Sequence, residues 1–166
     1  MFCARSKSVN RLKRLNPTIL TLANNHILDQ GIQGLKDTIK ILNEQSISYV
    51  GVGENDADFL SAYYVRIGNK IIGLFGCAEH EYTIATNRLS GNIPFESLDI
   101  SNTIRSIKEK RDFLIVLYHG GNEDPSPELR RRWHKMVDCG ADIIICQHSH
   151  SIGAFEEYKQ SGILYG

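Results

Sequence analysis

Phe113-Leu-Ile-Val-Leu-Tyr118 is an unbroken apolar run that ends at a histidine, His119. This pattern is typical of a strand whose two faces are both covered by other elements. Asp142-Ile-Ile-Ile-Cys146 repeats it after a predicted helix. That helix begins at Ser126, which supplies a capping hydroxyl, and it has a proline at its first position. A strand, a helix and a strand in this order predict an α/β fold.

The flanking sequence continues the alternation of strands and helices. Apolar spacing predicts two strands at residues 18–22 and 47–50, and two helices at residues 32–45 and 98–110. Two hairpins are also expected, at residues 62–67 with 70–75 around Gly68-Asn69, and at residues 155–158 with 163–165. Residues 78–95 lack periodicity and are predicted to form a long loop. We therefore expect a single α/β domain over residues 1–166.

The composition excludes several classes of protein. Lys+Arg and Asp+Glu balance at 19 each, so no overall charge attracts nucleic acid or an anionic membrane. No run reaches the ~18–20 apolar residues that a membrane span requires. None of the 4 cysteines forms a CxxC pair. In the basic first segment, the spacing of Val9, Leu12 and Leu15 favours a surface helix over a nucleic-acid-binding arm.

Three predicted strands end in side chains that can bind a metal. They lead to Asn24-Asn25-His26, to His119 and to His148-Ser149-His150. In α/β sheets, ligands collect beyond the carboxyl ends of the strands. Imidazole nitrogens suit Zn, Fe and Mn-type ions, and an Asn oxygen can complete the coordination sphere. Two such ions about 3.5–4 Å apart could bind a phosphate and activate a water.

Each segment also has a structural interpretation. A histidine after a strand is most often a hydrogen-bonded loop residue, and Asn24 and Asn25 could be turn residues. Asp29 could cap the helix that follows it. His80 is predicted to lie on the surface, and His134 is predicted to be structural. The metal interpretation rests on all three strand ends carrying such side chains.

Three segments keep the order and spacing of motifs in a known family. They are Ala23-Asn-Asn-His26 followed by Asp29-x-Gly31, His119-x-Gly121-x-Glu123, and Asp138-x-Gly140-Ala141-Asp142 followed by His148-x-His150. Together they resemble the capsule-synthesis CapA/PgsA family, and Tyr165-Gly166 matches the start of its closing Y-S-L-G-N-F stretch. That family is similar to the calcineurin-like metallophosphoesterases. The resemblance therefore implies a two-sheet sandwich flanked by helices.

The resemblance also implies a role for each site residue. Asn25, His119 and His148 would bind one divalent ion (Mn, Zn or Fe), and His150 would bind a second. His26 would contact the substrate or act as a general acid. The residues expected beside the metals or the substrate are Asn24, Asp29 and Glu123, of which Glu123 could orient His119.

Two departures from the family pattern bear on activity. Gln147 replaces the glycine before the family's H-x-H pair, so a side chain would crowd the metals. The family's first strand ends in an aspartate and leads to an N-L-E segment, and neither has a counterpart before Leu15. We therefore expect this chain to lack the amino-terminal part of the family domain, to be cut at its carboxyl end and to hold at most one weakly bound ion. We also expect exposed apolar surface that promotes self-association.

The implied function is a role in capsule or poly-γ-glutamate biosynthesis, as a metal-dependent hydrolase of phosphoesters. The expected partners are an anionic polymer or phosphoester substrate and other capsule-synthesis proteins, and no nucleic acid. A full-length family member would be a bacterial protein associated with the cell envelope. The alternatives are a non-catalytic scaffold or polymer-binding subunit, and a plain α/β domain with incidental histidines.

Overall fold

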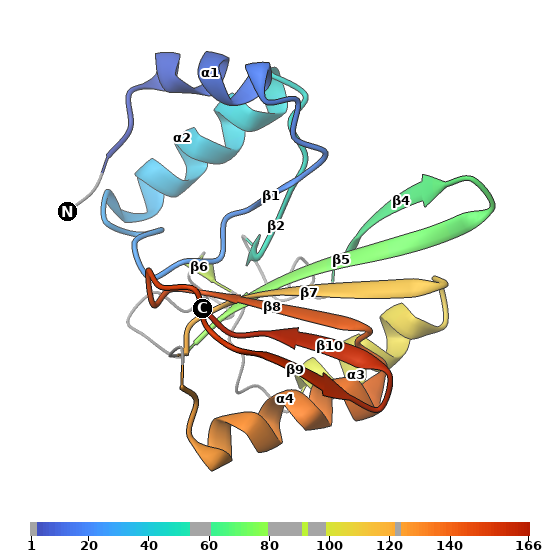
Figure 1. Cartoon of the computed structure of the whole chain (residues 1–166). Helices are drawn as coiled ribbons and strands as arrows, with labels where there is room; N and C mark the ends of the chain where they lie inside the picture. Colours follow the sequence, from blue (N-terminus) through green and yellow to red (C-terminus); the bar gives the residue numbers. More distant parts are fainter. Residues whose placement is uncertain (1–2, 54–60, 80–90, 93–98, 122–123) are drawn as a thin grey trace.

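A computed structural model describes residues 3–53, 61–79, 91–92, 99–121 and 124–166. The helices are α1 (Val9–Arg14), which follows the 3-10 turn η1 (Ser6–Ser8), α2 (Gly31–Glu44), α3 (Asp99–Lys108) and α4 (Pro127–Cys139). The strands are β1 (Leu20–Thr21), β2 (Tyr49–Val50), β3 (Val52–Gly53), β4 (Tyr63–Ile67), β5 (Lys70–Ala78), β6 (Gly91–Asn92), β7 (Phe113–His119), β8 (Ile143–Gln147), β9 (Phe155–Tyr158) and β10 (Ser161–Leu164). Figure 1 shows their arrangement.

Six strands form one mixed sheet in the order β4-β5-β7-β8-β10-β9. The four inner strands are parallel to one another, and β4 and β9 are antiparallel edge strands. Both predicted hairpins are therefore confirmed, and so is the α/β fold class. The parallel pair β1–β2 and the antiparallel pair β3–β6 form two smaller sheets.

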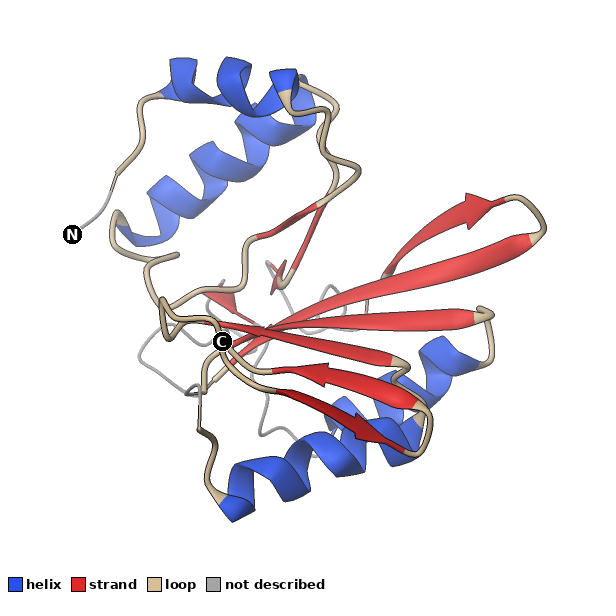
Figure 2. Ribbon diagram, viewed as in Figure 1, coloured by secondary structure: helices blue, strands red, loops and turns tan. Residues whose placement is uncertain are grey.

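α3 and α4 cover one face of the main sheet (Figure 2). Their apolar side chains pack against alternate positions of the inner strands, and the largest fully buried side chains of the chain include Trp133, Tyr118, Phe75, Ile104 and Leu114. α4 begins where the sequence predicts. The Ser126 hydroxyl caps the helix by accepting a hydrogen bond from the Leu129 amide at 3.2 Å. This core holds the inner strands from the helical side.

The opposite face of the main sheet is only partly covered. Along β7, Leu114 and Val116 are buried, whereas Ile115 between them is partly exposed. The prediction that this strand is covered on both faces is therefore correct for the helical side alone. The open face continues to the edge hairpin, where Phe155 is 66% exposed and Leu164 is 41% exposed.

The β1–β2 pair closes one end of this open face. A Cβ on Gly76 of β5 would lie only 2.9 Å from the Gly51 Cα, and a Cβ on Gly51 (φ +93°) would lie 2.7 Å from the Ala23 Cβ. The three segments therefore approach more closely than larger residues at the two glycine positions would allow. This contact brings the segment that follows β1 against the carboxyl-terminal part of β5.

Several element bounds differ from the predictions. β1 and β2 pair over two residues each and are shorter than predicted. β5 continues past Phe75 because its pairing with β7 extends from Ile72 to Ala78. Most of the predicted loop at 78–95 lies outside the described residues, but Gly91–Asn92 forms a strand that pairs with β3, so the loop prediction is wrong there. A strand of two residues has no periodicity to detect.

α1 lies on the surface with no buried residue, as predicted for the basic first segment. Within the described ranges, no helix combines the length and the apolar character needed to cross a bilayer.

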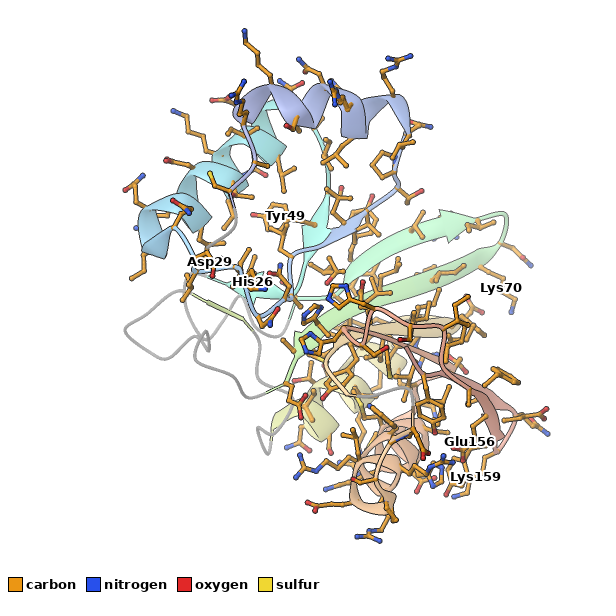
Figure 3. The ribbon with its side chains drawn as sticks, turned by 60° about the vertical axis from the view of Figure 1, so that its left-hand side comes forward. His26, Asp29, Tyr49, Lys70, Glu156 and Lys159 are labelled. Carbon is orange, nitrogen blue, oxygen red and sulfur yellow. The ribbon has the colours of Figure 1, made fainter. Side chains whose placement is uncertain are left out.

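A polar cluster on α4 and β9 lies away from the predicted site. The Glu156 carboxylate is 2.6 Å from His134 Nε2 and accepts a hydrogen bond from the Tyr165 hydroxyl. His134 also stacks on the Tyr158 ring, with centroids 3.9 Å apart, in agreement with its predicted structural role. The hydrogen bonds from Tyr165 and then from His134 lower the pKa of Glu156. Figure 3 shows that this cluster is well separated from His26.

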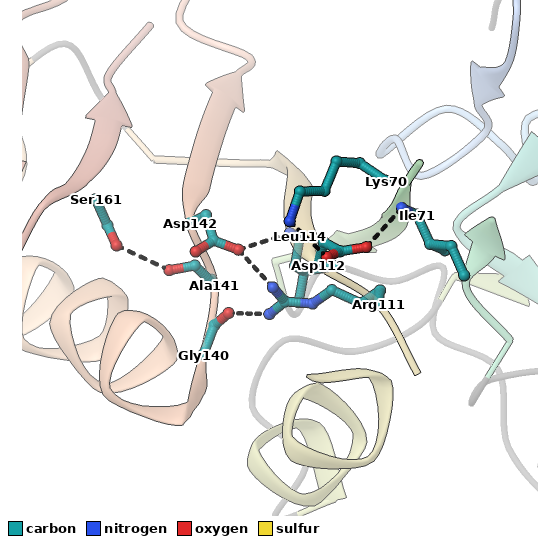
Figure 4. A network of polar contacts seen from close by, with 9 residues as sticks. All are labelled: Lys70, Ile71, Arg111, Asp112, Leu114, Gly140, Ala141, Asp142 and Ser161. Atoms are coloured by element: carbon teal, nitrogen blue, oxygen red, sulfur yellow. Dashed lines mark hydrogen bonds and ion pairs between the residues drawn. The ribbon is translucent and has the colours of Figure 1, made fainter. Parts of the chain in front are cut away.

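A second polar network joins the amino ends of β7 and β8 (Figure 4). Asp142 Oδ2 accepts hydrogen bonds from the Leu114 amide at 2.7 Å and from Arg111 Nη1 at 2.5 Å. Arg111 also donates to the Gly140 carbonyl, and its side chain is only 3% exposed. Burial lowers the pKa of Arg111, and the Asp142 charge opposes that effect. Asp142 thus neutralises a buried cation and fixes the offset between two strands.

We predict that Asp142→Ala lowers the free energy of unfolding by about 2–3 kcal/mol, because it leaves the buried Arg111 charge without its counterion and the Leu114 amide without its acceptor. Urea unfolding at pH 7 would measure the change. Asp138→Ala is the matched control, since Asp138 pairs with Lys159 in an exposed ion pair on the surface of α4. Equal effects of the two substitutions would contradict the proposed role of Asp142.

We also predict that Glu156 contributes to acid unfolding. Its folded-state pKa lies below the unfolded value of about 4.3, so its contribution is complete above that pH and is lost as the pH falls through the folded pKa. Glu156→Gln should therefore reduce the loss of stability between roughly pH 5 and pH 3. Urea unfolding across this range would test it, with exposed Glu157→Gln as the control. Identical pH profiles for Glu156→Gln and the wild type would rule out the contribution.

The partly exposed sheet face predicts self-association at high protein concentration. Sedimentation velocity over a concentration series should show a reversible increase in mean mass. Phe155→Lys should weaken it, because a charge on this face opposes apolar contact, whereas Ile152→Lys at a fully exposed loop position should not. A chain that stays strictly monomeric would refute the prediction.

Candidate metal centre

The carboxyl ends of β7 and β8 bring two predicted histidines together. The parallel register pairs His119 with Gln147, so His148 follows directly beyond the end of the neighbouring strand. His119 Nε2 and His148 Nδ1 are 3.2 Å apart, and the ring centroids are 5.0 Å apart with an interplanar angle of 73°. Both side chains are partly buried. Two imidazoles thus meet beyond the carboxyl ends of two neighbouring strands, as predicted.

Asn25 reaches the same place from the end of β1. The Leu22 amide donates to the Val50 carbonyl at 2.9 Å, and the chain then turns toward the main sheet. Asn25 Oδ1 lies 3.2 Å from His119 Nε2. His119 Nε2 therefore lies between an amide oxygen and the His148 imidazole nitrogen.

The distances from His119 Nε2 to the other two donor atoms are those expected between ligands of a single ion. Atoms about 2.1 Å from an ion lie roughly 3.0–3.4 Å from one another in octahedral or tetrahedral coordination. Asn25 Oδ1 and His148 Nδ1 each lie 3.2 Å from His119 Nε2, within this range. Asn25, His119 and His148 also line a small cavity of about 10 Å³ together with Ala78, Glu79 and Gly120. The chemistry and the spacing of these donors fit one divalent ion.

Asn25 is essential to that fit. Over the described ranges, no three His, Cys, Asp or Glu side chains form a group that could hold a metal ion. The set reaches three donors only through the Asn25 amide oxygen, and all three donors are uncharged when the imidazoles are neutral.

His150 lies at the outer edge of the site. Its residue has a left-handed backbone (φ +62°), its side chain is exposed, and its ring centroid is 6.4 Å from that of His148. It lines an open cavity of about 490 Å³ with Gln147, Ser151 and Ile152. The structure therefore does not bring His150 into the group of three donors, and its assignment to a second ion stays a prediction.

The turn after β1 holds three more of the predicted residues, Asn24, His26 and Asp29. The Asn24 side chain donates to the Leu22 carbonyl and accepts from the His26 amide, each at 2.9 Å, so Asn24 shapes the turn that presents Asn25. His26 Nδ1 is 3.2 Å from Asp29 Oδ2, and the two residues lie side by side in Figure 3. The cap position of α2 is Gln30, so Asp29 is not the helix cap.

Comparison with known proteins identifies the family. The family model described as "Bacterial capsule synthesis protein PGA_cap" matches residues 1–166. The chain belongs to this family.

Curated PGA_cap relatives are considerably longer than this chain. The "Capsule biosynthesis protein CapA" of Bacillus anthracis is 34% identical, over 98% of this chain and 42% of the relative. The "PGA biosynthesis protein CapA" of Bacillus subtilis is 32% identical, over 96% of this chain and 43% of the relative. A "probable polyglutamine synthesis accessory protein" of Mycobacterium tuberculosis is 29% identical, over 96% of this chain and 46% of the relative. The chain thus spans less than half the length of these relatives.

Other residues of the segments that carry the family resemblance lie away from the donors. Asp142 belongs to the network at the amino ends of the strands, and Asp138 pairs with Lys159 at 2.7 Å. The Gln147 carbonyl accepts a hydrogen bond from the Gly120 amide at 3.1 Å, which ties the two strand ends together. Glu123 and His80 lie outside the described residues, so the orientation of His119 by Glu123 stays a prediction.

Glu79 is a site residue that the sequence analysis missed. It follows the last residue of β5, its amide donates to the His119 carbonyl at 2.9 Å, and its side chain lines the same small cavity as the three donors. Residues 76–78 continue the strand beyond the predicted end at Phe75. Had this extension been recognised, Glu79 would have marked a fourth strand end that carries a polar residue.

Proposed function

We propose that this chain takes part in bacterial capsule or poly-γ-glutamate biosynthesis and carries a metal-dependent hydrolase centre of the metallophosphoesterase type. The names of the two Bacillus relatives support the biosynthetic role. The convergence of Asn25 Oδ1, His119 Nε2 and His148 Nδ1 within 3.2 Å steps supports the centre. The proposed ion is Mn, Zn or Fe, since amide oxygen with imidazole nitrogen suits these metals.

Different residues of the chain would bind the ion and donate the proton in such a centre. A bound divalent ion supplies Lewis-acid polarisation of a phosphoryl oxygen and lowers the pKa of a bound water. Asn25, His119 and His148 would hold and orient this ion. His26 is exposed, follows Asn25 directly and is oriented by Asp29, so it can donate a proton to a leaving oxygen.

The proposed substrate is a phosphoester or an anionic polymer that presents oxygen ligands to the ion. The open cavity that His150 lines adjoins His119 and His148, so an extended anionic chain could lie beside the donors. Other capsule-synthesis proteins at the bacterial cell envelope are the proposed partners.

A second candidate function is a scaffold or polymer-binding subunit without catalysis. The position of His150 favours it, since this exposed side chain lies outside the group of three donors. A centre with one ion can still bind the oxygens of an anionic polymer. The two-metal mechanism of hydrolysis needs a second ion as well.

We predict that the chain binds at most one Mn²⁺ or Zn²⁺ and that His148→Ala abolishes this binding together with any metal-dependent hydrolysis of an aryl phosphate. Removing one of three donors leaves too few ligands to retain the ion. Isothermal titration calorimetry would give the stoichiometry, and release of the aryl alcohol would give the activity. His134→Gln is the control, because it alters a histidine in the separate cluster on α4.

Three experimental outcomes distinguish the hydrolase function from the scaffold function and test the single-ion geometry. Binding and hydrolysis that His148→Ala leaves unchanged would refute the proposed centre. Binding without hydrolysis in the wild type would favour the scaffold function. Two tightly bound ions per chain would contradict the single-ion geometry.

A further inference from the structure

The three donors leave an electrostatic problem at the centre. An Asn amide and two neutral imidazoles carry no negative charge, so an ion held by them alone would keep its full charge in a partly buried cavity. Burying an unneutralised charge is costly, and metal sites offset this cost with nearby carboxylates. A carboxylate close to the donors is therefore expected on physical grounds.

Glu79 is the carboxylate in that position. Its side chain lines the small cavity with Asn25, His119 and His148. Its Oε2 accepts a hydrogen bond from the Gly121 amide at 3.2 Å, and a carboxylate can accept through its other oxygen at the same time.

The backbone after β7 makes room for this side chain. Gly120 has φ +147°, and a Cβ there would lie 2.7 Å from Glu79 Cβ and 2.8 Å from Glu79 Oε2. Any larger residue would therefore push the carboxylate away from its place. The Glu79 amide bond to the His119 carbonyl and the carboxylate bond to Gly121 hold this side chain against the segment that carries His119.

We propose that Glu79 is the charge-bearing positioning residue of the centre: its carboxylate fixes the His119–Gly121 turn and offsets the charge of a divalent ion held by Asn25, His119 and His148. The inference rests on the proposed metal centre. Glu79 acts from beside the donors, because no group of three acidic, His or Cys ligands that could hold an ion exists among the described residues.

Glu79→Gln separates charge from structure. The amide oxygen of Gln can still accept the Gly121 hydrogen bond, so the fold and the turn should persist while the negative charge is lost. We expect an unchanged thermal midpoint and an affinity for Mn²⁺ that is lower by about 10-fold or more, the usual effect of removing an outer carboxylate. Glu79→Asp keeps the charge and should bind Mn²⁺ more tightly than Glu79→Gln.

Calorimetric titration with Mn²⁺ alone and with Zn²⁺ alone would measure these affinities for the wild type, both Glu79 variants and His148→Ala. Glu157→Gln, an exposed carboxylate on β9, is the matched control and should bind as the wild type does. Wild-type affinity in Glu79→Gln, with loss of binding in His148→Ala, would overturn the role of Glu79 and leave the centre intact. A wild-type chain that takes up no ion would overturn both proposals.

Discussion

Asp142 fixes the relative position of β7 and β8 from their amino ends, where its carboxylate accepts hydrogen bonds from the Leu114 amide and the buried Arg111 guanidinium. Parallel strands have no hairpin to set their register, so side-chain anchors and packing must set it. A shift of one residue would turn every side chain of β8 to the other face of the sheet. It would also separate His148 from His119. The site at one end of the strands therefore depends on a charge pair at the other end.

A second constraint is the close contact between the small β1–β2 layer and the main sheet. Gly51 and Gly76 allow two backbones to approach within a distance that side chains would prevent. The turn that Asn24 stabilises then carries Asn25 to within 3.2 Å of His119. This contact lies on the face of the sheet opposite α3 and α4, so the packing of these helices does not contribute to it. The centre is thus built where two layers meet, and each layer supplies donors that the other lacks.

The sequence predicted the parts of this arrangement that local pattern controls. The apolar run before His119, the capped helix at Ser126 and the turn at Gly68-Asn69 each have a local physical signature, and each formed as expected. Three strand ends with polar residues predicted that the segments of Asn25, His119 and His148 come together, and the structure brings these three side chains to one place. Their selection as the ligands of one ion came from the family resemblance and stays a prediction.

Other features depend on contacts that a local pattern does not contain. β6 and the short β1–β2 pairing exist only because distant segments lie alongside them. Glu79 was missed because β5 runs on through a glycine, a cysteine and an alanine, which carry little strand signal, and is extended there by pairing with β7. The part-exposed face of β7 could not be distinguished from a covered one, since an apolar side chain has the same identity in both environments.

The charge of the centre constrains what this chain can do. Three uncharged donors with one adjacent carboxylate leave a bound divalent ion with a net positive charge, and this charge attracts phosphate or carboxylate oxygens of a substrate. His150 is directed to the open cavity beside the donors, where a polymer could contact both the ion and the imidazole. In the proposed centre, binding of an anionic chain would need only the three donors, Glu79 and the open cavity that His150 lines. Hydrolysis would also need a positioned water and a proton donor, and we propose His26 with Asp29 for the second role. Polymer binding would therefore require fewer residues of this chain than catalysis would.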